Sequence, residues 1–181
     1  MLTPADFTFP AKRGVKLLTD RIGSLGADDH ITATFFSERY GVFVMTGSAA
    51  LSTTVGMRAV GGQFIEQGGK PDKTLQLLEL LEEPSVIAAD DTADLAAAVS
   101  ALSHGDLVRA QFTHRSYGDF TISGPVVWSV PGAAFLIGGW LVASGGAAAP
   151  RLVSLATIAA AGSHPVGVPA SITRVGEDAD L

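Results

Sequence analysis

The hydrophobic and polar positions of this chain follow one pattern twice. When the 181-residue sequence is moved 77 places along itself, residues 18–81 match residues 95–158 without a gap, and 16 of the 64 pairs are identical. The identical pairs are glycines, turn residues and apolar residues, which are the positions that a backbone and a core constrain most. A repeat of this length predicts one structural unit used twice.

Each copy is predicted to begin with a short helix. Alanine-rich residues 93–102 carry apolar side chains at spacings of four and three, which places Leu95, Val99 and Leu102 on one helical face. Leu18, Ile22 and Leu25 form the matching set in the first copy.

Alternation then predicts strands. Residues 31–35 and 108–112 alternate between apolar and polar side chains, which is the pattern of a half-buried strand. Tyr40-Gly41 and Tyr117-Gly118 predict hairpin turns into return strands. Each return strand contains a glycine, Gly47 or Gly124, where a strand could bend to wrap a small barrel.

Paired glycines mark the rest of each copy. A third strand is predicted with one Gly-Gly pair inside it, so that a large side chain can approach, and Trp140 is a candidate for this role. A second Gly-Gly pair predicts a turn before the fourth strand. The third, fourth and fifth strands are expected over residues 59–66, 74–81 and 86–89, and again over residues 134–142, 150–158 and 166–175.

These elements predict a mainly β protein with short helices (α+β), a tandem duplication of a helix-plus-five-strand unit about a pseudo-two-fold axis. This element order resembles that of small SH3-like or Sm-like barrels, and a split barrel or a tandem β-sandwich fits nearly as well. The expected divisions are an N-terminal arm over residues 1–13, repeats over residues 14–89 and 90–175, and a loose acidic tail over residues 176–181.

Charge distinguishes the two copies. Charged residues make up only 17% of the chain, against roughly 25% in an ordinary soluble domain. Between Phe120 and Thr173 the one formally charged residue is Arg151, whereas residues 43–83 of the first copy carry eight. The second copy either packs against the first or forms a homo-oligomer interface, since buried interfaces lose charge. The residues expected at such an interface are Trp128, Phe135, Ile137 and Trp140.

The longest uncharged run raises the question of a membrane span. Residues 126–143 number 18, close to the lower limit for crossing a bilayer, but they include a proline and three glycines. The matching first-copy segment holds Arg58 and Glu66, which a membrane helix does not tolerate. We therefore expect no membrane span and, without a recognisable signal segment, a cytoplasmic location.

Four side chains gather at the predicted hairpin tip of the second copy: His114, Arg115, Tyr117 and Asp119. They could bind an anionic ligand, because histidine and arginine supply N–H donors. The alternative is a solvated turn, which is favoured because the first copy shares only the Tyr-Gly pair.

Other catalytic and binding chemistry is not indicated. The chain has no cysteine, which excludes disulfides and thiolate chemistry, and its remaining histidines lie apart without metal-ligand spacing: His30, His104 and His164. Gly68-Gly69-Lys70 lacks the GxxxxGK[ST] spacing, and no G-x-S-x-G elbow is present. We therefore expect no catalytic residue, cofactor or metal.

The sequence thus predicts a non-enzymatic structural or interaction protein that forms a homo-oligomer or docks on a protein partner. One alternative is a nucleic-acid-associated regulator, although net charge −6 and scattered cations argue against it. Another is a small-ligand-binding protein with a site between the repeats. The only basic cluster for the first alternative is Lys12, Arg13, Lys16 and Arg21.

Overall fold

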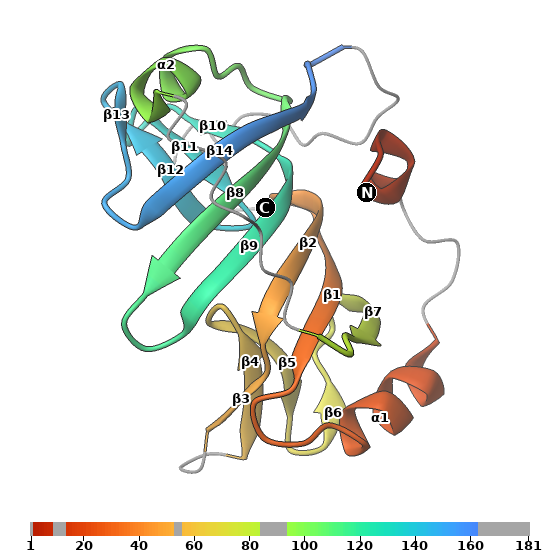
Figure 1. Ribbon diagram of the computed structural model, residues 1–181. Helices are drawn as coiled ribbons and strands as arrows, with labels where there is room; N and C mark the ends of the chain where they lie inside the picture. The colour runs from red at the N-terminus through yellow and green to blue at the C-terminus, as the bar shows by residue number, and fades with distance from the viewer. Residues whose placement is uncertain (1, 9–13, 53–55, 84–93, 163–181) are drawn as a thin grey trace.

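The structure, a computed structural model, describes residues 2–8, 14–52, 56–83 and 94–162 (Figure 1). These residues form a mainly β protein with fourteen strands, two α-helices and a 3-10 helix, which confirms the predicted class. The helices are η1 (Pro4–Phe7), α1 (Val15–Gly23) and α2 (Leu95–Ser100). The strands make three antiparallel sheets, and none of these sheets closes into a barrel within the described residues.

The largest sheet has six strands, three from each half of the chain. Its order is β14-β8-β9-β2-β1-β7, and the hairpins β1-β2 and β8-β9 turn where the Tyr-Gly pairs predicted. The strand bounds are β1 (His30–Ser37), β2 (Gly41–Ser48), β7 (Leu75–Leu80), β8 (Leu107–His114), β9 (Gly118–Pro125) and β14 (Leu152–Ala159).

Two small four-stranded sheets lie on opposite ends of the molecule, one in each half (Figure 1). Helix α1 packs against β6 and β7, and α2 packs against β13 and β14. Every strand from β1 to β7 begins 77 positions before its counterpart among β8 to β14. The small sheets consist of β3 (Ala50–Ser52), β4 (Met57–Val60), β5 (Gln63–Gln67) and β6 (Lys70–Pro71), and of β10 (Val127–Ser129), β11 (Ala134–Ile137), β12 (Trp140–Ser144) and β13 (Ala147–Ala148).

The predicted third strand is wrong, because its Gly-Gly pair is a hairpin turn. Gly61 and Gly62 have φ of 53° and 83° and separate β4 from β5, and Gly138 and Gly139 have φ of 54° and 90° and separate β11 from β12. Two consecutive residues with positive φ form the tight turn that antiparallel strands prefer. Each half therefore has seven strands in the described residues, and the five-strand barrel unit is not what the chain forms.

The mid-strand glycines cause no register shift in the β1-β2 and β8-β9 hairpins. Gly47 stays within β2 opposite Ile31, and the chain leaves the central sheet two residues later, at Ala49. The backbone N–H of Ala49 donates to the Asp29 carbonyl at 2.8 Å, and that of Val126 donates to the Asp106 carbonyl at 2.9 Å. These bonds hold the two corners where each half passes from the large sheet to a small one.

The two halves meet along β2 and β9, in the middle of the large sheet. Met45 pairs with Ile122, the residue 77 positions further along the chain, so this pair joins two equivalent positions of the two halves. The adjacent pairs are Val44 with Ser123 and Thr46 with Thr121. Residue 121 is equivalent to residue 44, and residue 123 is equivalent to residue 46, so the two pairs are also equivalent to each other. An arrangement in which equivalent patches face each other is what a two-fold axis produces.

Glycines of each half receive aromatic rings of the other half. A Cβ at Gly61 would lie 2.7 Å from Cδ2 of Phe120, and a Cβ at Gly138 would lie 2.8 Å from Cδ2 of Phe43. A Cβ at Gly62 would lie 2.8 Å from Cε2 of Tyr117, and a Cβ at Gly139 would lie 3.5 Å from Cε2 of Tyr40. The large side chains at the Gly-Gly pairs are therefore tyrosine and phenylalanine of the opposite half, instead of the expected Trp140.

Several predicted segments lie outside the described residues. These are the fifth strands over residues 86–89 and 166–175, part of the arm over residues 1–13, and the tail over residues 176–181. No helix in the described part of the chain is both long and apolar enough to cross a membrane. Most of the uncharged run over residues 126–143 forms β10, β11 and the start of β12.

Candidate functional site

The tip of the β8-β9 hairpin carries an aromatic cluster. The His114 and Tyr117 rings stack with centroids 4.4 Å apart, and Trp140 meets both rings edge-on, at 5.7 Å and 6.4 Å. Trp140 also lies 5.0 Å from Phe120, which connects the cluster to the core. The structure thus brings His114, Tyr117 and Trp140 together, although the sequence assigned Trp140 to an interface.

A hydrogen bond gives His114 a role within the turn. The Ser116 backbone N–H donates to Nδ1 of His114 at 2.9 Å, which requires that nitrogen to be unprotonated. Partial desolvation of this half-buried ring, followed by repulsion from Arg151, lowers the pKa of His114 below its ordinary value of 6.5. In the first half, Ser37 Oγ accepts from the Tyr40 backbone N–H at 3.0 Å, so both hairpins use a side-chain acceptor at this position.

The other two candidates at this tip, Arg115 and Asp119, are exposed. Asp119 belongs to β9 and pairs with Thr113 across the hairpin. The cluster therefore presents rings that pack on one another, with two charged side chains in solvent. This arrangement is typical of a solvated turn stabilised by aromatic packing, the interpretation that the sequence favoured.

We expect substitution of Arg151 to raise the pKa of His114. The Arg151→Ala change removes the repulsive charge but leaves the partial desolvation of the ring, so the pKa of His114 should rise and remain below 6.5. The stability that His114 contributes is present above pH 6.5 and is lost as the pH falls through the folded-state pKa. NMR titration of the His114 ring measures this shift, with Arg109→Ala as the matched control on β8. An unchanged pKa in Arg151→Ala would contradict the assignment.

The four predicted interface residues have different positions in the structure. Ile137 is fully buried and belongs to the core, so it is not available to a partner, and Trp140 packs in the cluster described above. Trp128 and Phe135 are half-buried, and their ring centroids lie 4.8 Å apart. These two residues pair across β10 and β11 on the small sheet of the second half.

Trp128 and Phe135 help to line a pocket of about 370 Å³ between α2 and the small sheet. Each residue around it is uncharged: Val99, Ser100, Leu102, Trp128, Ala133, Phe135, Ala143, Gly145 and Gly146. This pocket lies within the second half, not between the halves. Small-molecule pockets are commonly apolar and of this size.

The same place in the first half is filled by an ion pair. Arg58 and Glu66 occupy the positions equivalent to Phe135 and Ala143, and Arg58 Nε lies 3.3 Å from Glu66 Oε1. Both side chains are largely buried, at 15% and 10% exposed, and Arg58 also donates to the Gly26 carbonyl at 3.2 Å. The long arginine side chain thus spans the space between the small sheet and the loop after α1.

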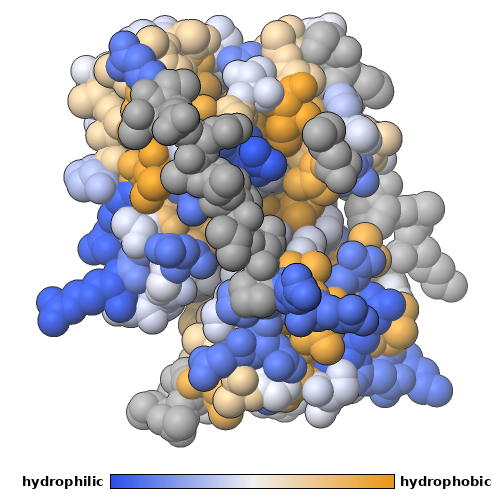
Figure 2. All heavy atoms as spheres, viewed as in Figure 1, coloured by the Kyte–Doolittle hydropathy of each residue, from blue (hydrophilic) through white to orange (hydrophobic). Residues whose placement is uncertain are grey.

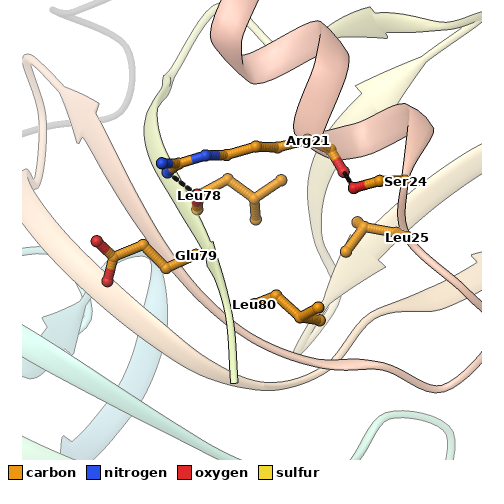
Figure 3. A pocket seen from close by; sticks show the side chains of 6 residues that line it. All are labelled: Arg21, Ser24, Leu25, Leu78, Glu79 and Leu80. Carbon is orange, nitrogen blue, oxygen red and sulfur yellow. Dashed lines mark hydrogen bonds between the residues drawn. The ribbon is translucent and has the colours of Figure 1, made fainter. Parts of the chain in front are cut away.

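A second pocket, of about 260 Å³, lies between α1 and β7 in the first half (Figure 3). Arg21 extends across Leu78 and donates to its backbone carbonyl, and the Ser24 hydroxyl donates to the Arg21 carbonyl at 2.8 Å. The guanidinium of Arg21 is therefore bound to the protein's own backbone. Glu79 and Leu80 complete the outer rim.

Metal-ligating side chains do not cluster in the part of the chain that the structure describes. No group of three His, Asp or Glu residues there lies close enough to hold an ion. Nδ1 of His104 accepts from the Trp128 backbone N–H at 3.1 Å, and Asp106 accepts from the backbone N–H groups of Ser103 and Ala161 at 2.8 Å. These side chains thus satisfy backbone groups, and His164 lies outside the described residues.

Sequence reasoning missed the pocket beside α2, although the internal alignment contains the signal. Replacement of Arg58 and Glu66 by Phe135 and Ala143 removes a charged pair from two neighbouring strands at once. In the sequence, the loss of charge indicates packing against the first copy or a homo-oligomer interface, whereas in the structure the smaller alanine helps to leave a hollow. Comparison with protein families, with curated proteins and with solved structures gives no match.

Proposed function

We propose that this chain is a non-catalytic interaction protein, built by duplication of a helix-plus-seven-strand unit, that self-associates through the outer edge of β14. The observation that carries this proposal is the contrast between the two edges of the central sheet. One edge strand bears a charged side chain and the other has none.

Duplication is supported by four features. The 16 identities at one fixed shift are accompanied by strands that begin at the same shift and by a central pairing about Met45 and Ile122. The shared tyrosines, phenylalanines and glycines make reciprocal contacts between the halves. A unit that once paired with an identical partner would retain these residues in both copies.

The β7 edge is protected by charge. Glu79 is exposed on this strand, and Glu82 and Glu83 follow the strand after one intervening residue, Leu81. Carboxylates on an edge strand discourage pairing with another chain, because like charges would be brought together. The first half therefore has an edge that repels a second copy of itself.

The β14 edge has no such protection. Residues 152–159 contain no charged side chain, and no described strand pairs with the outer side of β14. Ser154 to Thr157 pair with β8 in regular register between two irregularities, so their outer backbone groups form a short regular edge. The half that contains this edge is also the paler and more orange part of Figure 2, whereas blue residues gather over the first half. Two antiparallel β14 strands would join two central sheets into one, with a two-fold axis between them.

Glutamate at position 156 should abolish self-association. Ala156→Glu gives β14 the residue that β7 has at the equivalent position, Glu79, and places two like charges across the proposed strand pair. We expect a concentration-dependent dimer for the wild type and a monomer for Ala156→Glu in analytical ultracentrifugation. The control is Leu80→Glu, which adds the same charge to exposed β7 and should leave the dimer unchanged. A wild type that stays monomeric at millimolar concentration would refute the proposal.

Neither alternative from the sequence is supported by a comparable feature. Within the proposed basic cluster, Arg21 donates to the Leu78 carbonyl, and Lys12 and Arg13 lie outside the described residues. For a site between the repeats, the contact surfaces at Gly61 and Gly138 are occupied by phenylalanine rings. Each of the two pockets described above lies inside one half, and neither lies between the halves.

A further inference from the structure

We infer that the pocket between α2 and the second small sheet is a binding site for a small, uncharged molecule that contains an aromatic or other apolar ring. This inference is independent of self-association through β14. It depends on the pocket's lining, on the filled counterpart in the first half, and on one strained residue.

The lining selects an uncharged ligand. The nine lining residues carry no charged group, and Trp128 and Phe135 form an aromatic wall with ring planes tilted by 57°. A charged ligand would lose its hydration without gaining a partner, which is a large cost, whereas a ring gains aromatic contact. The space of about 370 Å³ is more than twice the roughly 150 Å³ of an engineered cavity that holds benzene, so a molecule of two or three rings fits.

Two lining residues carry a side-chain polar group, the Ser100 hydroxyl and the Trp128 indole N–H. The Ser100 hydroxyl donates to the Ala96 carbonyl at 2.8 Å, and its oxygen retains lone pairs that can accept one hydrogen bond. The remaining polar groups in the wall belong to the backbone, where the Gly145 N–H already donates to the Ala133 carbonyl at 3.0 Å. We therefore expect a ligand with at most one or two polar atoms.

Comparison of the two halves shows that this space is not a necessary consequence of the fold. In the first half the Arg58–Glu66 pair fills the equivalent position, with both side chains largely buried. In the second half the same two strand positions carry Phe135 and Ala143, which leave the space open and remove its charge. The two substitutions act together, because loss of one ion-pair member alone would leave a buried unpaired charge.

The rim of the pocket contains a strained backbone. Ala133 has φ of 43°, in the left-handed region, and its first-half counterpart is Gly56 with φ of 59°. Glycine adopts this conformation without steric conflict, whereas alanine does not. The second half thus keeps a methyl group in the pocket lining despite the strain, which is typical of residues at functional sites.

The test is titration of the full chain with N-phenyl-1-naphthylamine, an uncharged fluorescent probe with three rings. We expect saturable binding with enhanced probe fluorescence, and NMR shifts at the methyl groups of Ala133 and Ala143. No binding at millimolar protein, or shifts confined to other residues, would overturn the inference. Measurement on Ala156→Glu separates the two proposals, because the pocket should bind the probe whether or not β14 pairs.

The variant for this test fills the pocket with the ion pair that the first half has at the same position. Phe135→Arg with Ala143→Glu recreates the Arg58–Glu66 pair and should weaken probe binding by at least about tenfold, equivalent to the loss of one buried ring contact. The control Phe64→Arg removes an exposed phenylalanine on β5, outside the pocket, and should leave binding unchanged. Circular dichroism establishes that both variants fold. A folded double variant that binds as tightly as the wild type would overturn the inference, as would NMR shifts of the wild type that map elsewhere.

Discussion

Gly61→Ala is expected to destabilise the protein by about 2–5 kcal/mol, as the sum of a backbone cost and a packing cost. The residue has φ of 53°, and its new methyl group would lie 2.7 Å from Cδ2 of Phe120 and 2.6 Å from Cε of Met45. The end of the methionine side chain can move, but the Phe120 ring is stacked on Phe112 with centroids 5.5 Å apart. Such a loss is a large part of the 5–15 kcal/mol that stabilises an ordinary domain.

Gly68→Ala separates these two costs. Gly68 is the first glycine of the next Gly-Gly turn and has nearly the same φ, 58°, but nothing lies within 4 Å of the position of its Cβ. Only the backbone cost of about 1–2 kcal/mol should appear. Urea unfolding of both variants, followed by circular dichroism, measures the difference.

The second half repeats the comparison. Gly138→Ala should be as damaging as Gly61→Ala, because its methyl group would lie 2.8 Å from Cδ2 of Phe43, and Gly145→Ala should be as mild as Gly68→Ala. An equal loss of stability in all four variants would mean that the Phe120 and Phe43 rings do not pack against Gly61 and Gly138. The contact between the halves would then have to be assigned to other residues.

Local patterns in the sequence predicted most of the elements within each half. Helical spacing located α1 and α2, and alternation located β1 and β8, because these signals depend on which face of an element is buried. Asp29 and Asp106 are one of the identical pairs, and each accepts from a backbone N–H group three residues earlier, that of Gly26 or Ser103. The sequence was sufficient to predict structure that depends on residues close to one another in the chain.

The Gly-Gly pairs show where local reasoning failed. A glycine inside an apolar segment is compatible with a close approach in a strand or with a turn of positive φ, and composition does not distinguish the two. Gly61 and Gly62 serve both purposes, because they turn the chain and receive Phe120 and Tyr117 from the other half. Which ring contacts each glycine depends on how the two halves pack against each other, and the sequence pattern within one half does not contain this information.

The candidate sites follow the same division. The hairpin at His114 was located from its turn residues, and the structure adds the stacking on Tyr117 and the approach of Trp140 from β12. At the pocket beside α2, the sequence pattern indicates only that the second half lacks charged residues. The volume of the pocket depends on Phe135 and Ala143 lying beside α2, a tertiary relation that no periodicity within the sequence reports.

Phe120→Ala is expected to destabilise the protein by about 3–5 kcal/mol, because it removes a buried ring and leaves a cavity. Phe120 is 2% exposed; its Cβ lies beside Gly47 and its ring lies against Gly61 of the first half, with Trp140 at 5.0 Å from the ring. Phe64→Ala is the control, since Phe64 is 37% exposed and its truncation should cost about 0.5 kcal/mol. Thermal or urea unfolding measures both changes.

The double variant Gly61→Ala with Phe120→Ala tests whether the two residues act on each other. Once the ring is gone, the added methyl group enters the cavity, so the second substitution should cost only the backbone term of about 1–2 kcal/mol. The interaction energy should then be about 1–3 kcal/mol in favour of the double variant. Gly68→Ala with Phe120→Ala should be additive within about 0.5 kcal/mol, because Gly68 has no neighbour to lose. An additive Gly61 pair would show that the ring and the glycine do not touch in solution, and the pairing of the two halves through these residues would be wrong.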